Sequence, residues 1–297
     1  MYLSAEHCAS LPTCPAIPRY TVEALLEKGS GELNEDVLLE ADDLFGVFDG
    51  ATSLDKRKFA GLTGGLLAAK IAARIFQEEH GCLASLADKA NRCIRHTLLA
   101  ENVSMADRHR LWSTSLAVIR LTADSFEYCQ TGDAMILLIQ DDGSHRLVVP
   151  ETDIDRETLH LWKKASPAQA TNIQELLADQ IHRVRLQMNV SYGVLNGEPE
   201  AVRFLRHGFV DLTRVNDILL FTDGLFLPRE NPLETDDWQR LVDLYCEGGL
   251  QAVRNIVRRL QRQDPTCRKY PRFKQHDDIA AVAIRLHGVP QPAITFS

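Results

Sequence analysis

LFGVFDGATSLD (residues 44–55) begins like a buried strand and then stops at a carboxylate. Its first five residues are apolar apart from one glycine, and Asp49 and Gly50 follow directly. Two interpretations of this ending are open. Asp-Gly is a common turn pair, and a strand end is also a rigid position from which a carboxylate can be held toward a ligand. The rest of the chain has to decide between them.

The composition is that of an ordinary globular chain. Its 297 residues are 45% hydrophobic and 25% charged, which suffices for a sizeable core in one large domain. The formal net charge is −8, and no local cluster of Lys and Arg compensates for it, so we expect no nucleic-acid partner. No stretch approaches the roughly 20 apolar residues that span a bilayer, so we expect no membrane partner either.

The N-terminus and the cysteines indicate a cytoplasmic protein. Residues 1–20 lack the basic start and apolar core of a signal peptide, and they contain three prolines. The seven cysteines show no metal-ligand spacing, and an odd number without a secretory signal is typical of reduced thiols. We therefore expect an arm packed on the domain (1–27), one domain (28–287) and a tail (288–297).

The hydrophobic pattern predicts helices combined with antiparallel sheets. Helical spacing covers 59–79 and 83–103, which form an antiparallel pair. Runs rich in β-formers, separated by turn residues, predict a meander over 113–149. Weaker helices follow over 151–190. The remaining segments are two strand candidates, AVRFLR (201–206) and NDILLFTDGLF (216–226), two helices, DDWQRLVDLY (236–245) and GLQAVRNIVRRLQRQ (249–263), and a last strand, DIAAVAIRL (278–286). This order predicts an α+β fold rather than a regular βαβ array.

Acidic residues stand next to several of these strands. Besides Asp49-Gly50 in the opening stretch, they are a second Asp-Gly ending, Asp223-Gly224, and two acidic pairs, Glu35-Asp36 and Asp277-Asp278. A hairpin of residues 37–39 with 45–48 would place Asp36 close to Asp49.

Bunched carboxylates repel one another unless cations compensate. Hard oxygen ligands without His or Cys suit Mg²⁺ or Mn²⁺. Two such ions about 3.5–4 Å apart can activate a hydroxide for attack on phosphorus. The spacing alone leaves turns and a metal site both open.

Six short motifs occur in a characteristic order: NED (34–36), VFDG (47–50), STSLAV (113–118), TGDA (131–134), FTDG (221–224) and HDDIAAVAI (276–284). In this order the chain resembles the protein phosphatase 2C-like family, the metal-dependent serine/threonine phosphatases, as a divergent bacterial member. The resemblance covers residues 28–287. It implies a four-layer α-β-β-α sandwich of two antiparallel sheets flanked by helical pairs, in agreement with the hydrophobic pattern.

The resemblance also implies the catalytic and metal-binding residues. Asp49 corresponds to the acid that bridges two metal ions, and the carbonyl of Gly50 to a further ligand. Asp223 and Asp277 correspond to the other principal ligands of one ion. These three aspartates form the implied catalytic set. Gly50 is expected because only glycine lets the backbone carbonyl approach so closely.

The remaining implied ligands serve the other ions. Glu35 and Asp36 correspond to the acidic pair of the second ion, directly or through water. Asp133 corresponds to the acid that helps to hold a weaker third ion in some members. The implied cofactors are therefore two Mn²⁺ or Mg²⁺ ions and a weaker third.

The departures from the family concern phosphate binding and proton transfer. Gly31 stands where the family commonly has an arginine that binds the substrate phosphate. Ala51 replaces a histidine of some members, and Met135 replaces the arginine of a Gly-Asp-Ser-Arg motif. Arg57, with Lys56, could bind the substrate phosphate instead, or both could be solvated charges that open a helix.

Two other features near the expected cleft have open interpretations. The loop NVSYGVLNGEP (189–199) could contact substrate or simply connect two elements. His276 stands beside Asp277, where a plain loop histidine is the simpler interpretation.

The leading hypothesis is an enzyme that hydrolyses phosphoserine or phosphothreonine in proteins by metal-activated water, without a phosphoenzyme. Its expected partner is a phosphorylated protein. An alternative is a pseudo-phosphatase that keeps the fold as a binding or regulatory module; the missing arginine and histidine favour it, whereas the complete acid set disfavours it. An aspartyl-nucleophile phosphatase is discounted, because that chemistry needs a second acid where Ala51 stands.

Overall fold

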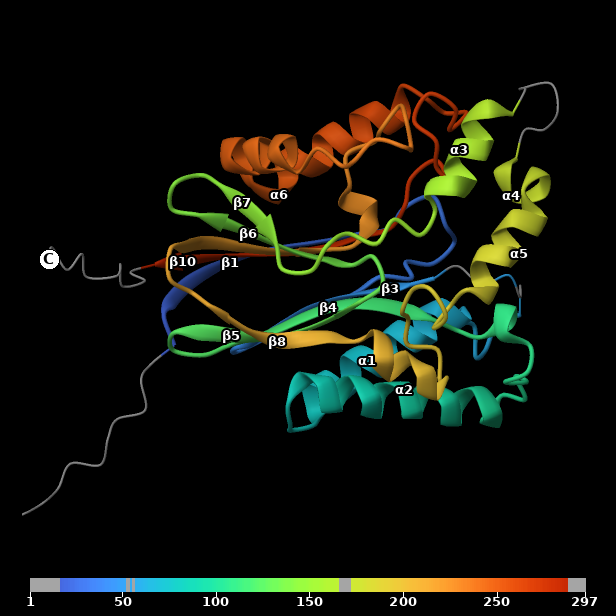
Figure 1. Cartoon of the computed structure of the whole chain (residues 1–297), viewed down its shortest axis with the longest axis horizontal. Coiled ribbons are helices and arrows are strands. Elements are labelled where there is room, and N and C mark those ends of the chain that lie inside the picture. The colour runs from blue at the N-terminus through green and yellow to red at the C-terminus, as the bar shows by residue number, and fades with distance from the viewer. Residues whose placement is uncertain (1–16, 52–53, 55–56, 166–171, 288–297) are drawn as a thin grey trace, which may run out of the picture.

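Two five-stranded antiparallel sheets lie face to face in the computed structural model, which describes residues 17–51, 54, 57–165 and 172–287 (Figure 1). The first sheet has the order β1-β10-β9-β6-β7 and the second the order β2-β3-β4-β5-β8. The strands are β1 (Arg19–Glu27), β2 (Val37–Ala41), β3 (Leu44–Gly50), β4 (Thr114–Leu121), β5 (Ser125–Thr131), β6 (Met135–Gln140), β7 (His145–Leu147), β8 (Arg206–Asp211), β9 (Val215–Phe221) and β10 (Ile279–His287).

Helices cover the outer faces of both sheets. The predicted pair, α1 and α2, covers the second sheet, α6 covers the first, and α3, α4 and α5 lie together beyond one end of the sheets (Figure 1). The helices are α1 (Gly64–Glu78), α2 (Leu83–Ala100), α3 (Arg156–Lys164), α4 (Ile173–Leu176), α5 (Ala178–Leu186) and α6 (Trp238–Arg262), with 3₁₀ helices η1 (Arg108–Arg110), η2 (Pro199–Phe204) and η3 (Asp223–Leu225). The α+β four-layer sandwich is confirmed.

Both faces of the central strands are buried, which explains why the opening stretch is continuously apolar. In β3, Phe45 and Val47 pack between the sheets, whereas Leu44 and Phe48 pack on the side of α1 and α2. Alternate side chains of a strand point to opposite faces, and here each face meets a hydrophobic layer. Asp49 continues the row of Phe45 and Val47, so it lies at the end of the layer between the sheets.

The prediction of a single meander over 113–149 is wrong, because the chain changes sheets within it. β4 pairs with β5 in the second sheet, whereas β6 pairs with β7 and β9 in the first. The crossing passes through Gly132, which has a φ of +77°, and a Cβ there would lie 2.2 Å from Ser115 Oγ. A Thr-Gly turn signal does not distinguish a hairpin from a crossing between sheets.

Three further segments differ from expectation or refine it. Residues 19–27, assigned to the arm, form β1 and pair along their length with β10; residues 1–16 and the tail, 288–297, lie outside the described residues. The strand expected over 201–206 is wrong, since most of it belongs to η2. The two helices expected after residue 236 meet in α6 at a non-helical Gly248–Gly249 junction. The domain limits stay a prediction.

Within the described residues, none of the helices has both the length and the apolar character needed to cross a membrane.

Candidate metal centre

Five aspartates from both sheets meet at one end of the layer between the sheets. Asp36 and Asp49 belong to the β2–β3 hairpin, whose antiparallel pairing brings them together as predicted. Asp223 follows β9, Asp277 precedes β10, and Asp133 stands at the crossing from β5 to β6. We call these five residues the acid cluster.

The acid cluster is electrostatically strained. Burial raises the pKa of Asp49 well above its ordinary value, and the charges of Asp36 and Asp133 raise it further. Burial raises the pKa of Asp223 in the same way, with Asp277 as the strongest neighbouring charge. Burial also raises the pKa of Asp36, although a hydrogen bond from Thr222 opposes the shift. The cluster therefore favours either protons or cations.

Hydroxyl groups orient two members of the acid cluster. Thr222 Oγ1 donates to Asp36 Oδ2 at 2.7 Å, which joins the end of β9 in the first sheet to the start of β2 in the second. Ser115 Oγ donates to Asp133 Oδ1 at 2.6 Å. Each bond leaves the second carboxylate oxygen available to another partner.

Glu35 lies beside Gly50 in a tightly packed corner. Gly50 N donates to the carbonyl of Glu35 at 3.2 Å, and a Cβ on Gly50 would lie 2.6 Å from that oxygen. Thr63 Oγ1 donates to Glu35 Oε1 at 2.5 Å. Close packing thus gives a second reason for glycine at this position.

The carboxylate of Asp278 accepts two backbone N–H groups. Gly29 N lies 2.6 Å from Oδ1, and Glu35 N lies 2.9 Å from Oδ2. An asparagine would offer only one acceptor oxygen to these two donors. The carboxylate of Asp278 therefore connects the segment before β2 to the start of β10.

Asp277 is anchored by two basic residues. Lys274 Nζ lies 2.7 Å from Asp277 Oδ1, and the buried guanidinium of Arg258 on α6 donates to the Asp277 carbonyl at 2.7 Å. Arg258 also donates to Glu27 of β1 at 2.8 Å. Glu23, on the same strand, accepts the backbone N–H that begins the second piece of α6 at 3.0 Å. Strand β1 therefore supports Asp277 through α6.

A cleft of about 140 Å³ opens beside the acid cluster. Asp133, Asp223 and Asp277 line it together with Asp155 and Lys274. Burial and the charge of Asp133 raise the pKa of Asp155 to about 7. Neither Asp155 nor Lys274 was predicted from the sequence as a cleft residue. The only signal for Lys274 is its position three residues before Asp277.

Arg57, the predicted phosphate-binding residue, lines a different hollow. That hollow has a volume of about 390 Å³ and is formed with Leu54, Arg110 and residues 102–104 and 107. The Arg57 guanidinium lies 5.3 Å from the centre of the Phe59 ring. Arg57 is not part of the cleft lining, so its role in phosphate binding stays a prediction; Lys56 lies outside the described residues.

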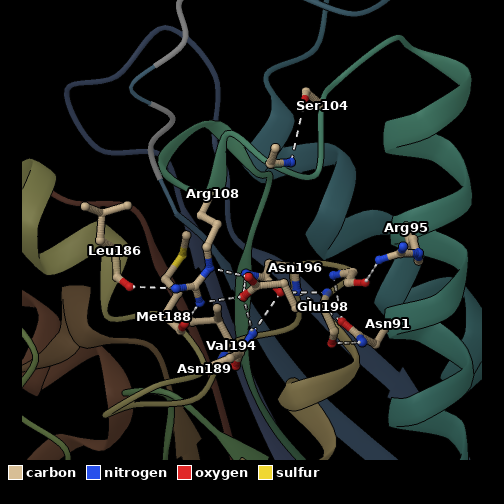
Figure 2. A network of polar contacts seen from close by, with 12 residues as sticks. Asn91, Arg95, Ser104, Arg108, Leu186, Met188, Asn189, Val194, Asn196 and Glu198 are labelled. Carbon is tan, nitrogen blue, oxygen red and sulfur yellow. Dashed lines mark hydrogen bonds and ion pairs between the residues drawn. The ribbon is translucent and has the colours of Figure 1, made fainter.

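The loop over 189–199 is a buried polar brace (Figure 2). Its centre is Glu198, which receives hydrogen bonds from Arg108, Asn189 and Asn196, the last at 2.8 Å. Asn91 of α2 donates to the carbonyl of Glu198 at 2.8 Å. We call these five residues the Glu198 network. Within the loop, Leu195 pairs with the first residue of β4, so this segment holds one strand of the second sheet in place.

His276 has a structural role. Its ring Nδ1 lies 2.9 Å from Gln261 Oε1, and its carbonyl accepts the N–H and hydroxyl of Ser30, each at 2.9 Å. These bonds join the loop before β10 to the segment after β1. The interpretation as a plain loop histidine agrees with this geometry.

The chemistry of the donors fits a hard divalent cation. All the predicted ligands offer oxygen, and Mg²⁺ and Mn²⁺ prefer carboxylate and carbonyl oxygen. Burial and neighbouring carboxylates raise the pKa values of Asp36, Asp49, Asp133 and Asp223. A bound cation would offset the repulsion among these carboxylates. The ammonium group of Lys274 already pairs with Asp277. Within the described part of the chain, however, no three His, Cys, Asp or Glu side chains form a ready-made cage. The individual ligand assignments therefore stay predictions.

Comparison with known proteins points to one family. A family model described as protein phosphatase 2C matches residues 28–263, whereas no curated protein matches the chain. The fold is similar to PppA of Pseudomonas aeruginosa, described as a key regulatory component of T6SS, with 17% identity over 91% of this chain and 99% of that chain and a TM-score of 0.56.

Two structures of another bacterial protein are also similar. The serine/threonine phosphatase PstP/Ppp of Mycobacterium tuberculosis has 16% identity over 92% of this chain and 100% of that chain, with a TM-score of 0.56. The catalytic domain of PstP in complex with 2 manganese ions has 15% identity over 92% and 99%, with a TM-score of 0.52. At these identities the likeness shows the fold.

Proposed function

Because the chain belongs to the protein phosphatase 2C family, we propose that it is a metal-dependent phosphatase that hydrolyses phosphoserine or phosphothreonine in proteins. The observation that carries the proposal is the acid cluster, in which five aspartates from two sheets lie close enough for their charges to interact. Carboxylates that repel one another lower the stability of a fold, so their presence together indicates that they bind a cation.

Bound Mn²⁺ or Mg²⁺ would supply an activated hydroxide and neutralise charge on the phosphoryl oxygens. In this proposal Asp49, Asp223 and Asp277 hold the catalytic ions. The manganese complex of the similar PstP domain supports a two-ion site. Glu35, Asp36 and Asp133 complete the set, with the Gly50 carbonyl as a further ligand.

The chain's own residues would hold this set rigid. Asp49 ends a strand that pairs on both sides, with β2 and with β4. The hydroxyl groups of Thr222 and Ser115 fix the direction of Asp36 and Asp133. Preorganised groups of this kind lower the reorganisation needed during reaction.

A second candidate function is a pseudo-phosphatase that acts as a binding or regulatory module. Gly31 and Ala51 remove two groups that relatives use on the substrate, and no three-residue cage is preformed in the described residues. In this case the acid cluster would bind cations without turnover.

Metal titration together with turnover separates the two candidates. We expect calorimetry to show Mn²⁺ binding, and a phosphothreonine peptide to be hydrolysed only with Mn²⁺ or Mg²⁺ present. EDTA should abolish hydrolysis, and a thiol-blocking reagent should not. Metal binding without hydrolysis would favour the binding module. Full activity in a rigorously metal-free sample would contradict both.

A further inference from the structure

The cleft needs a cation for the substrate phosphate, because Gly31 replaces the usual arginine. In the described part of the chain, three basic residues line the cleft: Arg229, Arg272 and Lys274. A bound phosphate dianion would pair with the cation that loses the fewest existing contacts when it moves to the phosphate. The present partners of these three residues therefore indicate which one can bind the phosphate.

Two of the three cations are occupied by structural partners. Arg229 pairs with Asp153 at 3.0 Å and with Asp236 at 3.3 Å. Arg272 pairs with the buried Asp264 at 2.9 Å and also donates to four backbone carbonyl groups. Withdrawing either guanidinium would leave buried acceptors unpaired, which costs about 1–3 kcal/mol for each group.

Lys274 differs because its partner is an expected metal ligand. Its ammonium contacts Asp277 Oδ1 at 2.7 Å, and a quarter of its side chain is exposed. Its charge also acts on Asp49 and Asp223. A divalent cation held by Asp277 would repel an ammonium group at the same carboxylate. The flexible four-carbon stem allows that ammonium to move toward another anion in the cleft.

We infer that Lys274 binds the phosphate group of the substrate, in the role that an arginine fills where this chain has Gly31. The inference rests on the proposed function and names the residue that recognises the substrate's phosphate. Lys274 leaves Asp277 when a divalent ion is bound there, and its ammonium then pairs with a phosphoryl oxygen. A lysine makes a point-charge contact rather than a two-pronged one, so the contact is looser than that of arginine.

Binding of inorganic phosphate tests the inference without requiring turnover. The full chain, saturated with Mg²⁺, is titrated with phosphate by calorimetry, and the variants are Lys274→Met, Lys274→Arg and Lys269→Met. Lys269 is the matched control, because it lies in the same segment, pairs with Glu230 at 3.4 Å, and has a half-exposed side chain outside the cleft. Arg57→Met and Arg185→Met test the other cations, since the charge of Arg185 acts on Asp133 and Asp155.

We expect Lys274→Met to weaken phosphate binding by about 10- to 100-fold. Lys274→Arg should restore most of the affinity, and Lys269→Met should match the wild type. Mg²⁺ affinity should stay equal or rise in Lys274→Met, because a competing cation is removed. With a phosphothreonine peptide, the same variant should raise KM more than it lowers kcat.

Three outcomes would overturn the inference: unchanged phosphate affinity in Lys274→Met, loss of Mg²⁺ binding in that variant, or a loss of phosphate affinity in Arg57→Met or Arg185→Met instead. These results differ from failure of the proposed function. If the wild type binds neither Mg²⁺ nor phosphate, the proposed function fails and the inference fails with it. If the wild type binds both and Lys274→Met does too, the inference alone fails.

Discussion

Glu198 and Asp49 are both carboxylates in enclosed surroundings, yet their environments are opposite. Burial would raise the pKa of Glu198, but hydrogen bonds from Arg108, Asn196 and Asn189 outweigh it and lower the pKa below its ordinary value. Burial raises the pKa of Asp49 well above the ordinary value, and the charges of Asp36 and Asp133 raise it further. The chain itself supplies hydrogen-bond partners for Glu198, whereas in the proposed function a bound cation would compensate the charge of Asp49.

This contrast separates structural polar groups from functional ones. A buried polar network in which every member is satisfied makes a fold rigid and specific. A buried cluster of like charges costs stability, and such perturbed groups are typical of functional sites. In this molecule the two kinds lie close in space, because the Glu198 network braces the beginning of β4 and β4 pairs with the strand that carries Asp49.

The largest expected effect comes from neutralising the centre of the acid cluster. Asp49→Asn should lower phosphatase activity in Mn²⁺ by at least about 10²-fold, since electrostatic groups at the reacting centre contribute that much or more. The metal-free fold should be equally stable or more stable, because one repelling charge is gone. Activity assays and thermal melts in EDTA check both expectations. A large loss of metal-free stability would instead make Asp49 a structural acid.

The matching change in the Glu198 network should give the opposite pattern. Glu198→Ala removes the acceptor for Arg108, Asn189 and Asn196, and we expect it to destabilise the fold by about 2–3 kcal/mol. Urea unfolding should show the same loss in EDTA and in Mn²⁺. The exposed Glu200 gives a control, since Glu200→Ala should change stability by no more than about 0.5 kcal/mol. A loss of stability seen in only one of the two solutions would contradict a purely structural role for Glu198.

The metal-free protein should become less stable as pH rises. The pKa values of Asp36, Asp49 and Asp223 in the folded state lie above the ordinary value of 3.8, so between that value and the raised ones the folded state holds more protons than the unfolded state. Stability is then highest below this window and is lost as pH rises through it. A tenfold difference in proton affinity between the folded and unfolded states corresponds to about 1.4 kcal/mol of stability.

Thermal melts in EDTA between pH 4 and pH 8 measure this slope, and about 2–4 °C is expected for each kcal/mol. Mn²⁺ should flatten the upper part of the curve, and Asp49→Asn should reduce the slope in EDTA. Stability that rises with pH in EDTA would show that the acid cluster is already compensated in the way that Glu198 is.

The smallest expected effect comes from placing an arginine at position 31, where the resemblance implies a residue that binds the substrate phosphate. Gly31→Arg should lower KM for a phosphopeptide by about tenfold. The backbone tolerates the change with a small shift, since Gly31 is not among the glycines with positive φ and its Cβ would lie 3.3 Å from the carbonyl of Leu33. Kinetics accompanied by a melt check the result; an unchanged KM in a normally folded variant contradicts it.

Much of the fold followed from local pattern, because the burial of both strand faces leaves continuous apolar runs. The runs at β3 and β9 each end in Asp-Gly, so the strands and the acids at their ends were visible together. The hairpin that joins Asp36 to Asp49 also followed, since it is a contact between neighbours in sequence. The crossing at Gly132 did not, because the assignment of a strand to one sheet or the other depends on partners far along the chain.

The site was less predictable where long-range contacts set it. Lys274 reaches Asp277 because Asp264 organises the preceding loop, accepting the backbone N–H groups of Arg268 and Tyr270 and the side chain of Arg272. Sequence spacing showed only a lysine near an acid. Conversely, Arg57 is near Asp49 in sequence but lines another hollow.

Strand β1 supports Asp277 through α6, so removing β1 from the chain would remove this support. The region that matches the family model begins at residue 28, just after the last residue of β1. A chain trimmed to that limit would lose Glu27, the partner of Arg258, and Glu23, which caps the second piece of α6. It would also expose the edge of β10 as a row of unpaired backbone groups, a common starting point for aggregation. Strand β1 is therefore part of the folded structure, although it lies upstream of the region that matches the family model.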